Sequence, residues 1–252
     1  MIEAGGHTLE VERIGVAPEG RPTLVFLHEG LGSVAMWRDF PVNLARMTHC
    51  NAVVYSRYGY GRSEPLAGSR TVRYMHDEAL IVLPELLDRL DIVQPVLVGH
   101  SDGGSIALIH AGSGVRPVRA VIAIAPHVMV EDISVHSIAA AREAFETTNL
   151  PQRLARYHDD VASAFWGWNR IWLDPLFRDW NIESLLAGVP CPVLAIQGED
   201  DEYGTAEQVR RITRRVRDGE VLMLSDCGHS PHRDQPEALM RSITRFIERI
   251  CP

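Results

Sequence analysis

Cysteine is scarce in this chain, with four residues among 252, and no two of them form a C-x-x-C pair. So few cysteines at such spacings exclude a disulfide-rich secreted module. The N-terminal residues also lack the basic region and apolar run of a signal peptide. We therefore expect a cytoplasmic protein with reduced cysteines, namely Cys50, Cys191, Cys227 and Cys251.

Long apolar runs and an excess of positive charge are missing as well. No stretch of about eighteen apolar residues occurs, so we expect no membrane span and no membrane partner. The net charge of −8 argues against a nucleic-acid partner. One basic run exists, at 210–217, with Ile212 and Val216 four positions apart inside it. This spacing favours a solvated helix with one apolar side, and an anionic partner is the alternative.

The pattern that is present alternates short apolar runs with glycine-rich breaks and longer helical stretches. A chain with 46% hydrophobic and 23% charged residues suits one globular α/β domain with a modest insertion. Nearly continuous apolar runs are typical of parallel strands covered on both faces. Six such strands are predicted, together with an antiparallel edge hairpin at His7–Ile14: Thr23–His28, Ala52–Ser56, Val96–Gly99, Ala120–Ala125, Pro192–Gln197 and Glu220–Ser225.

Helices are predicted between these strands, so the chain should form a mostly parallel, doubly wound sheet. Ligands of such sheets bind beyond the carboxyl ends of the strands. The regular spacing between predicted strands is interrupted once, by a helical and aromatic stretch that we interpret as a cap over the site. We therefore divide the chain into a core, residues 1–126 and 188–252, and a helical cap, residues 127–187. The predicted helices are Met36–Thr48, Val72–Leu90, Gly103–Ala111, Ala206–Arg217 and Pro236–Ile250.

The strongest local signal is Gly99-His100-Ser101-Asp102-Gly103, which has the form G-x-S-x-G and lies between a predicted strand and a predicted helix. The serine must occupy a sharp turn, and a β-carbon at either flanking position would crowd it. A helix start beside Ser101 also favours developing negative charge. We therefore predict that Ser101 is a nucleophile.

A serine hydroxyl needs a base and the base needs an acceptor. His229 directly follows the last apolar run, and Gly228 leaves its ring room to turn inward. His232 competes for the role, but we expect it at the surface, and H-x-x-H without a third ligand predicts no metal site. Asp201, in the acidic loop after the penultimate strand, is the predicted acceptor, and Asp200 is the fallback.

An oxyanion formed by attack on a carbonyl needs two N–H donors. One should be the backbone of Asp102. The other is assigned to Gly30 in the glycine-rich loop 28–33. For the side chain of Asp102, two interpretations stay open: a solvated or capping group, or a group that recognises a cationic or hydroxylated substrate.

These segments, together with 56–63 and 198–201, resemble the α/β-hydrolase superfamily over nearly all of the chain. Ser-Asp-Gly-Gly at the turn is similar to valacyclovir-hydrolase-like esterases and to small pimeloyl-ester-type carboxylesterases. The resemblance implies the α/β-hydrolase fold and the order Ser, Asp, His for the triad. The family usually has His-Gly where this chain has His28-Glu29. We expect Glu29 to point away from the site and the Arg57–Ser63 segment to brace the loop.

We predict a serine hydrolase that cleaves a small carboxylic ester, thioester or lactone through an acyl-enzyme, with no metal and no cofactor. A lyase, a C–C hydrolase or a perhydrolase could use the same triad, and a non-catalytic ligand receptor is a further alternative. The expected partner is a small-molecule substrate, and a homodimer is compatible with the sequence. The residues expected to contact the substrate are Leu31, His127, His158 and Trp166.

Overall fold

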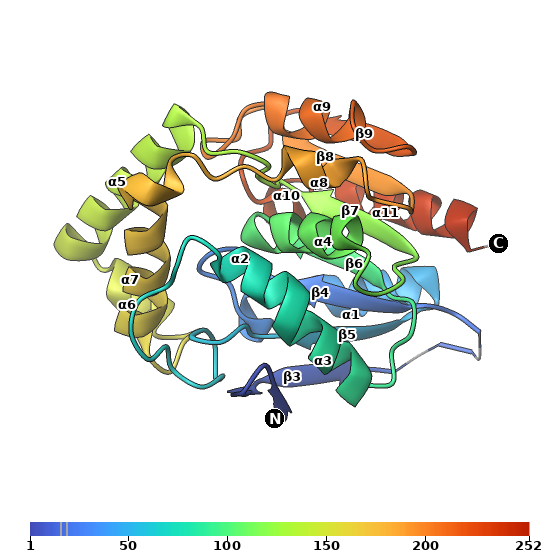
Figure 1. Cartoon of the computed structure of the whole chain (residues 1–252), viewed down its shortest axis with the longest axis horizontal. Helices are drawn as coiled ribbons and strands as arrows, with labels where there is room; N and C mark the ends of the chain where they lie inside the picture. The colour runs from blue at the N-terminus through green and yellow to red at the C-terminus, as the bar shows by residue number, and fades with distance from the viewer. Residues whose placement is uncertain (16, 19, 252) are drawn as a thin grey trace.

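The computed structural model describes residues 1–15, 17–18 and 20–251. These residues form a seven-stranded sheet at the centre of the molecule, in the order β3-β5-β4-β6-β7-β8-β9 (Figure 1). Within it only the β3–β5 pair is antiparallel, and the other neighbouring strands run parallel. The strands are β3 (Val11–Ile14), β4 (Thr23–Leu27), β5 (Asn51–Tyr55), β6 (Val96–His100), β7 (Ala120–Ile124), β8 (Val193–Gly198) and β9 (Gly219–Leu224). The mostly parallel, doubly wound α/β fold is confirmed.

All six predicted parallel strands are present, and each end lies within one residue of the prediction. The predicted hairpin at His7–Ile14 is wrong in its pairing. β2 (His7–Leu9) pairs with β1 (Ile2–Ala4) in a separate two-stranded sheet, whereas β3 pairs with β5 at the edge of the large sheet. Alternating polarity indicates a half-buried strand but carries no information about which strand is its partner.

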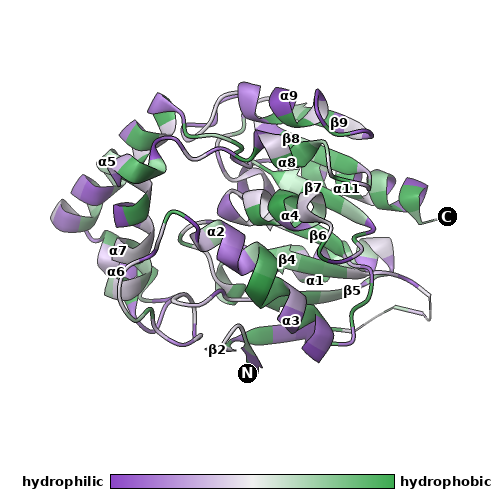
Figure 2. Ribbon diagram, in the orientation of Figure 1, coloured by the Kyte–Doolittle hydropathy of each residue, from purple (hydrophilic) through white to green (hydrophobic). Residues whose placement is uncertain are grey.

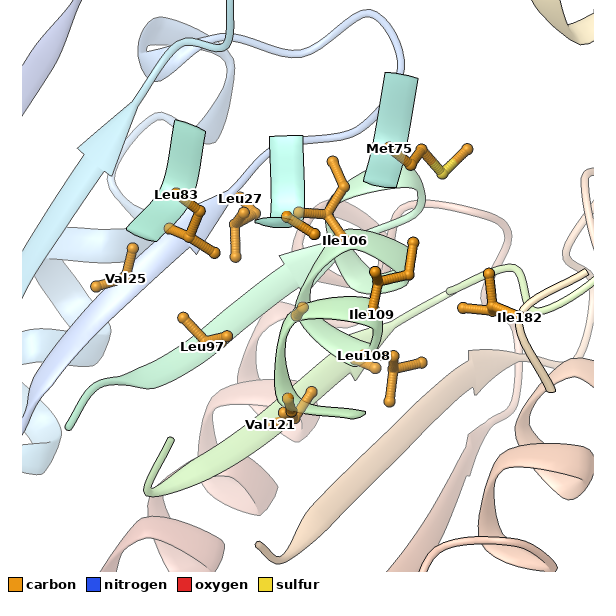
Figure 3. Packing of buried hydrophobic residues seen from close by; sticks show 14 of the residues in the cluster. Val25, Leu27, Met75, Leu83, Leu97, Ile106, Leu108, Ile109, Val121 and Ile182 are labelled. Carbon is orange, nitrogen blue, oxygen red and sulfur yellow. The ribbon is translucent and has the colours of Figure 1, made fainter. Parts of the chain in front are cut away.

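Helices cover both faces of the sheet because successive residues of each strand point to opposite sides. Val25 and Leu27 of β4 belong to one apolar cluster, and Leu24 and Phe26 belong to the other. The first cluster packs against α3 (Leu83–Arg89), α4 (Asp102–Ser113) and α9 (Glu207–Thr213). The second packs against α1 (Phe40–Thr48) and α11 (Pro236–Ile250). Figure 3 shows how side chains of β4, β6 and β7 meet those of α4 in the first cluster.

The helix predicted at Val72–Leu90 is interrupted. It consists of α2 (Tyr74–Asp77), a π-helical turn η2 (Glu78–Val82) and α3. The turn buries Glu78, whose Oε1 accepts a hydrogen bond of 2.7 Å from the Tyr55 hydroxyl. Two short helical segments lie directly before longer helices. The segment η1 (Val34–Trp37) lies before α1 and overlaps the start of the predicted helix Met36–Thr48. The segment α10 (Pro231–Asp234) lies before α11.

The segment between β7 and β8 is helical, with α5 (Asp132–Thr147), α6 (Leu150–Leu154), α7 (Val161–Trp172), η3 (Pro175–Phe177) and α8 (Glu183–Leu186). α5, α6 and α7 lie together at one side of the sheet (Figure 1). Hydrophobic residues gather in the strands and in α4, whereas α5 contains many hydrophilic residues (Figure 2). The division of the chain at residues 126 and 188 stays a prediction.

Two sequence interpretations can be compared directly with this fold. All four cysteines are free and buried. In the basic run, Ile212 and Val216 are buried as predicted, and Arg211 and Arg215 pair with the Glu183 carboxylate. The predicted helix Ala206–Arg217 is too long, because α9 ends at Thr213 and Val216 lies beyond it. Among the described residues, no helix has both the length and the apolar character needed to cross a bilayer.

We predict that Leu97→Ala lowers the free energy of unfolding by about 2–5 kcal/mol, because Leu97 is fully buried in β6 and its loss leaves a cavity. Val93→Ala is the matched control, since Val93 is 71% exposed, and its effect should stay within about 0.5 kcal/mol. Urea unfolding of both variants measures the difference. Equal small effects would contradict the packing described for β6.

Candidate active site

Ser101 occupies the turn between β6 and α4 in a strained backbone conformation, with φ 52° and ψ −117°. A residue with a side chain rarely adopts a positive φ, and such strain persists only where the surroundings enforce it. Here the Ser101 N–H donates to the Ile124 carbonyl at 2.8 Å. A methyl group on Gly99 would run into the Gly103 carbonyl, and one on Gly103 would run into the Leu27 carbonyl. The steric reason for G-x-S-x-G predicted from the sequence is therefore present.

His229 is held by a carboxylate from the loop after β8. Its Nδ1 lies 2.8 Å from Oδ1 and 2.9 Å from Oδ2 of Asp201. An ionised carboxylate only accepts hydrogen bonds, so the proton of the neutral ring is on Nδ1 and Nε2 is free to accept one. The fallback acid Asp200 is exposed, and its backbone N–H donates to the Cys227 carbonyl at 3.0 Å. Of the two acids, the structure brings Asp201 to the ring.

Asp201 is itself positioned by two further donors. The Gln197 side-chain Nε2 donates to its Oδ2 at 2.6 Å, and the Tyr203 backbone N–H donates to its Oδ1 at 2.8 Å. Burial acts to raise the pKa of Asp201, but the hydrogen bond and charge of His229, together with the bond from the Tyr203 backbone, outweigh it and hold the pKa below its ordinary value. Asp201 is therefore ionised when the site has its working arrangement.

A cavity of about 230 Å³ opens beside Ser101 and His229. Three more predicted site residues, Gly30, Leu31 and His127, lie in its wall. The His127 ring packs edge-on against Trp172 with centroids 4.9 Å apart, and burial lowers its pKa to about 3, so it is neutral. The other lining residues were not predicted as substrate contacts: Glu29, His100, Ile138, Trp168, Trp172, Glu202, Tyr203 and Ser230.

The two predicted oxyanion donors lie on elements that border this cavity. Asp102 is the first residue of α4, where backbone N–H groups have no partner within the helix. Gly30 lies against the indole of Trp168, which occupies the space a β-carbon would need. Donation from Gly30 and Asp102 to a bound oxyanion stays a prediction.

Two predicted substrate contacts lie away from the cavity. Trp166 packs on Phe145 and Phe165 and lines a different hollow, whereas Trp168 and Trp172 face the cavity. Residues four apart share one side of a helix, and Trp166 lies on another side of α7. This periodicity was the signal that could have identified Trp168 and Trp172 from the sequence.

His158, the second of these residues, contacts two backbone segments instead of the cavity. Its Nδ1 accepts from the Gly61 backbone N–H at 2.9 Å, and its Nε2 lies 2.9 Å from the Leu31 carbonyl. Both ring nitrogens are therefore used by backbone groups. Burial lowers the pKa of His158, which keeps the ring neutral and the two bonds intact. His158 joins the 28–33 loop to the 57–63 segment.

The side chain of Asp102 fits neither of the two sequence interpretations. It is fully buried, and it accepts hydrogen bonds from the Tyr74 hydroxyl at 2.7 Å and the Trp172 indole at 3.2 Å. A buried guanidinium, that of Arg57, lies 3.6 Å away. Its complete burial excludes a solvated carboxylate, and Asp102 is not among the described residues that line the cavity, so its side chain binds protein groups rather than a ligand in that cavity. Arg57 also donates to the Glu29 carbonyl at 2.8 Å and so braces the loop as predicted.

Two expected orientations are wrong. Glu29 does not point away from the site, because its side chain lines the cavity and its Oε2 lies 3.4 Å from Nδ1 of His100. His232 is not a surface residue. It is 9% exposed and packs 5.2 Å from the Trp37 ring, and burial lowers its pKa to about 3. Both orientations depend on neighbours that are distant in the sequence.

We predict that Asp201→Asn slows covalent labelling of Ser101 by a fluorophosphonate by about 10⁴-fold, because an amide favours the wrong tautomer of His229. Asp200→Asn, a matched change one residue away, should label at nearly the unmodified rate. Intact-protein mass spectrometry over time measures both rates. Equal slowing in the two variants would contradict the assignment of Asp201.

Comparisons with known proteins agree with this geometry. The model of the alpha/beta hydrolase family matches residues 24–241. The sn-1-specific diacylglycerol lipase ABHD11 of Danio rerio is 25% identical, covering 89% of this chain and 78% of the lipase. The 2-hydroxy-6-oxo-2,4-heptadienoate hydrolase of Pseudomonas putida is 22% identical, covering 98% and 95%. A carboxylesterase structure from Nitrososphaera gargenis superposes with a TM-score of 0.79 at 18% identity, covering 97% of this chain and 95% of that one.

The family match spans most of the chain, and the Ser101 turn, the His229–Asp201 pair and the cavity lie within the matched residues. The chain is a hydrolase of the alpha/beta hydrolase family.

Proposed function

We propose that this hydrolase cleaves a small, uncharged carboxylic ester through an acyl-enzyme formed on Ser101. The observation that carries the proposal is the shared cavity of Ser101 and His229, with Asp201 bonded to the far side of the histidine ring. A serine hydroxyl becomes a useful nucleophile only beside a base whose tautomer is held in this way.

The chemistry follows from these atoms. Ser101 Oγ attacks the ester carbonyl while Nε2 of His229 takes the hydroxyl proton. The negative charge then forms on the carbonyl oxygen, beside the first N–H groups of α4 and the loop of Gly30. His229 returns its proton to the leaving alcohol, and the acyl group stays on Ser101. A water molecule, deprotonated by the same ring, releases the acid.

The lining of the cavity supports an uncharged substrate. It contains two carboxylates, Glu29 and Glu202, and aromatic rings of Trp168, Trp172 and Tyr203. Among its described lining residues there is no arginine or lysine to pair with an anion. A volume of about 230 Å³ is below the 300–1,000 Å³ range of pockets for drug-sized ligands, which favours a short acyl group.

The same lining weighs against carbon–carbon bond cleavage of the kind named for the Pseudomonas putida relative. A heptadienoate is a carboxylate anion, and the described lining offers it no arginine or lysine, whereas the Glu202 carboxylate would repel it. Thioesters and lactones share the acyl chemistry of esters and fit the proposal as close substrates.

We expect turnover of p-nitrophenyl acetate and butyrate, with kcat/KM falling for longer acyl chains because the cavity is small. Ser101→Ala should lower kcat by about 10⁴-fold or more, since the nucleophile is lost. The charged monoester p-nitrophenyl succinate should react about tenfold more slowly than the butyrate, because its free carboxylate meets the Glu202 carboxylate and finds no arginine or lysine among the described lining residues.

Spectrophotometric rates give these values, and chromatography of the products separates hydrolysis from lyase or perhydrolase chemistry. Equal rates with Ser101→Ala would contradict the acyl-enzyme. A succinate monoester that reacts faster than the butyrate would contradict the uncharged substrate.

A further inference from the structure

A carboxylate lies next to the loop that is expected to bind the oxyanion. Glu29 directly precedes Gly30, lines the same cavity as Ser101, and has a side chain that is 19% exposed. An uncompensated negative charge at this place would oppose the negative charge that develops during attack on an ester. The site therefore needs a positive group close to Glu29.

His100, the residue before the nucleophile, provides that group. Its ring is buried, with Nδ1 3.4 Å from the Glu29 Oε2 and Nε2 2.7 Å from the His229 carbonyl oxygen. Both ring nitrogens thus face oxygen atoms that only accept hydrogen bonds. A neutral imidazole has one N–H and can serve one of them, whereas the imidazolium has two and can serve both.

Each end of this ring touches a different catalytic segment. Glu29 belongs to the oxyanion loop after β4, His100 ends β6 immediately before the Ser101 turn, and His229 lies in the loop after β9. The three segments are far apart in sequence and meet at one side chain. A protonated His100 therefore holds the oxyanion loop, the nucleophile turn and the loop of the base together.

We propose that the Glu29–His100 pair positions the active site, and that the enzyme is fully active only while His100 is protonated. This inference rests on the proposed ester hydrolysis for its kinetic consequence. The contact itself does not depend on which substrate the enzyme uses.

The charges around the pair agree with a protonated His100. Burial alone would lower the pKa of His100, but the hydrogen bond and charge of Glu29, the His229 carbonyl and the charge of Asp201 raise it above its ordinary value. The pKa of Glu29 lies well below its ordinary value: burial opposes this, and His100 outweighs burial. The other titratable or charged groups near the pair are the His229 ring, whose centroid lies 5.1 Å from that of His100, and Arg57, whose guanidinium binds the Glu29 carbonyl. Four histidines with lowered pKa values also lie near the pair: His28, His127, His158 and His232.

Loss of the His100 proton should lower the activity. As pH rises through the pKa of His100, the ring loses its proton while Glu29 stays ionised. One hydrogen bond of the ring is lost, and an unpaired carboxylate remains beside the oxyanion loop. We therefore expect kcat for a neutral ester to fall on the alkaline side.

Glu29→Gln should remove this alkaline fall, because a neutral amide needs no imidazolium beside it. Glu202→Gln removes another carboxylate of the same cavity, and its amide oxygen can still accept the His229 backbone N–H that Glu202 Oε2 accepts at 3.1 Å. This variant should keep the fall, so it controls for cavity charge in general. Acid release from ethyl butyrate, followed by automatic titration across the pH range, measures kcat without an indicator group. An alkaline fall that persists unchanged in Glu29→Gln would overturn the proposal.

Removing the charge of each partner, singly and together, gives a second test. His100→Gln can still donate a hydrogen bond but carries no charge, and it should lower kcat about tenfold, a coupling typical of neighbouring charged groups. Adding Glu29→Gln to this variant should restore activity to about that of Glu29→Gln alone. Thermal unfolding shows whether each variant is folded. Additive losses in the double variant would contradict charge compensation.

Direct titration of His100 separates failure of this inference from failure of the proposed function. In histidine-labelled protein, NMR should give a pKa for His100 above its ordinary value, and Glu29→Gln should lower it. This readout needs no substrate. A shifted His100 in a protein without ester turnover would reject the proposed substrate and keep the pair. An ordinary pKa for His100 that Glu29→Gln does not change would reject the pair.

Discussion

The strained backbone of Ser101 is the constraint on which the site depends. Its positive φ lifts the hydroxyl out of the turn toward the cavity, and the conformation is held from outside. The backbone of β4 presses on Gly103, and the Ile124 carbonyl of β7 takes the Ser101 N–H. Two neighbouring strands of the sheet thus set the position of the Ser101 hydroxyl. A loosely packed sheet could not store this strain.

The helices between β7 and β8 are coupled to that turn through α7. Trp168 packs on Gly30, and the Trp172 indole donates to the buried carboxylate of Asp102, the residue after Ser101. Asp102 is in turn close to the guanidinium of Arg57, which also binds the oxyanion loop. A buried charge is tolerated only when it is paired and hydrogen-bonded. The carboxylate of Asp102 therefore links α7, α4 and, through Arg57, the 28–33 loop in one network of buried contacts.

Sequence reasoning succeeded where a local rule decides the structure. Parallel strands must be apolar on both faces, so β4 to β9 were found to within one residue of each end. A serine at a strained turn needs small neighbours, so Gly99 and Gly103 marked Ser101. Reasoning failed for the directions of side chains. Glu29 was expected to point away, yet its orientation is set by His100, 71 residues further along the chain. Trp166 was expected to face the substrate, although the periodicity of α7 places it on another side of the helix from Trp168 and Trp172.

The sequence by itself determined the doubly wound sheet, the order of its parallel strands along the chain and the segments that carry Ser101, Asp201 and His229, because periodicity and turn chemistry are local properties. Only the tertiary structure decided that Asp201 rather than Asp200 reaches His229, that Asp102 is already paired with Arg57, and that His100 lies between Glu29 and the His229 backbone. These are contacts between segments about 30 to 130 residues apart. Their geometry follows from how the ends of several strands converge at one edge of the sheet, which no local pattern in the chain encodes.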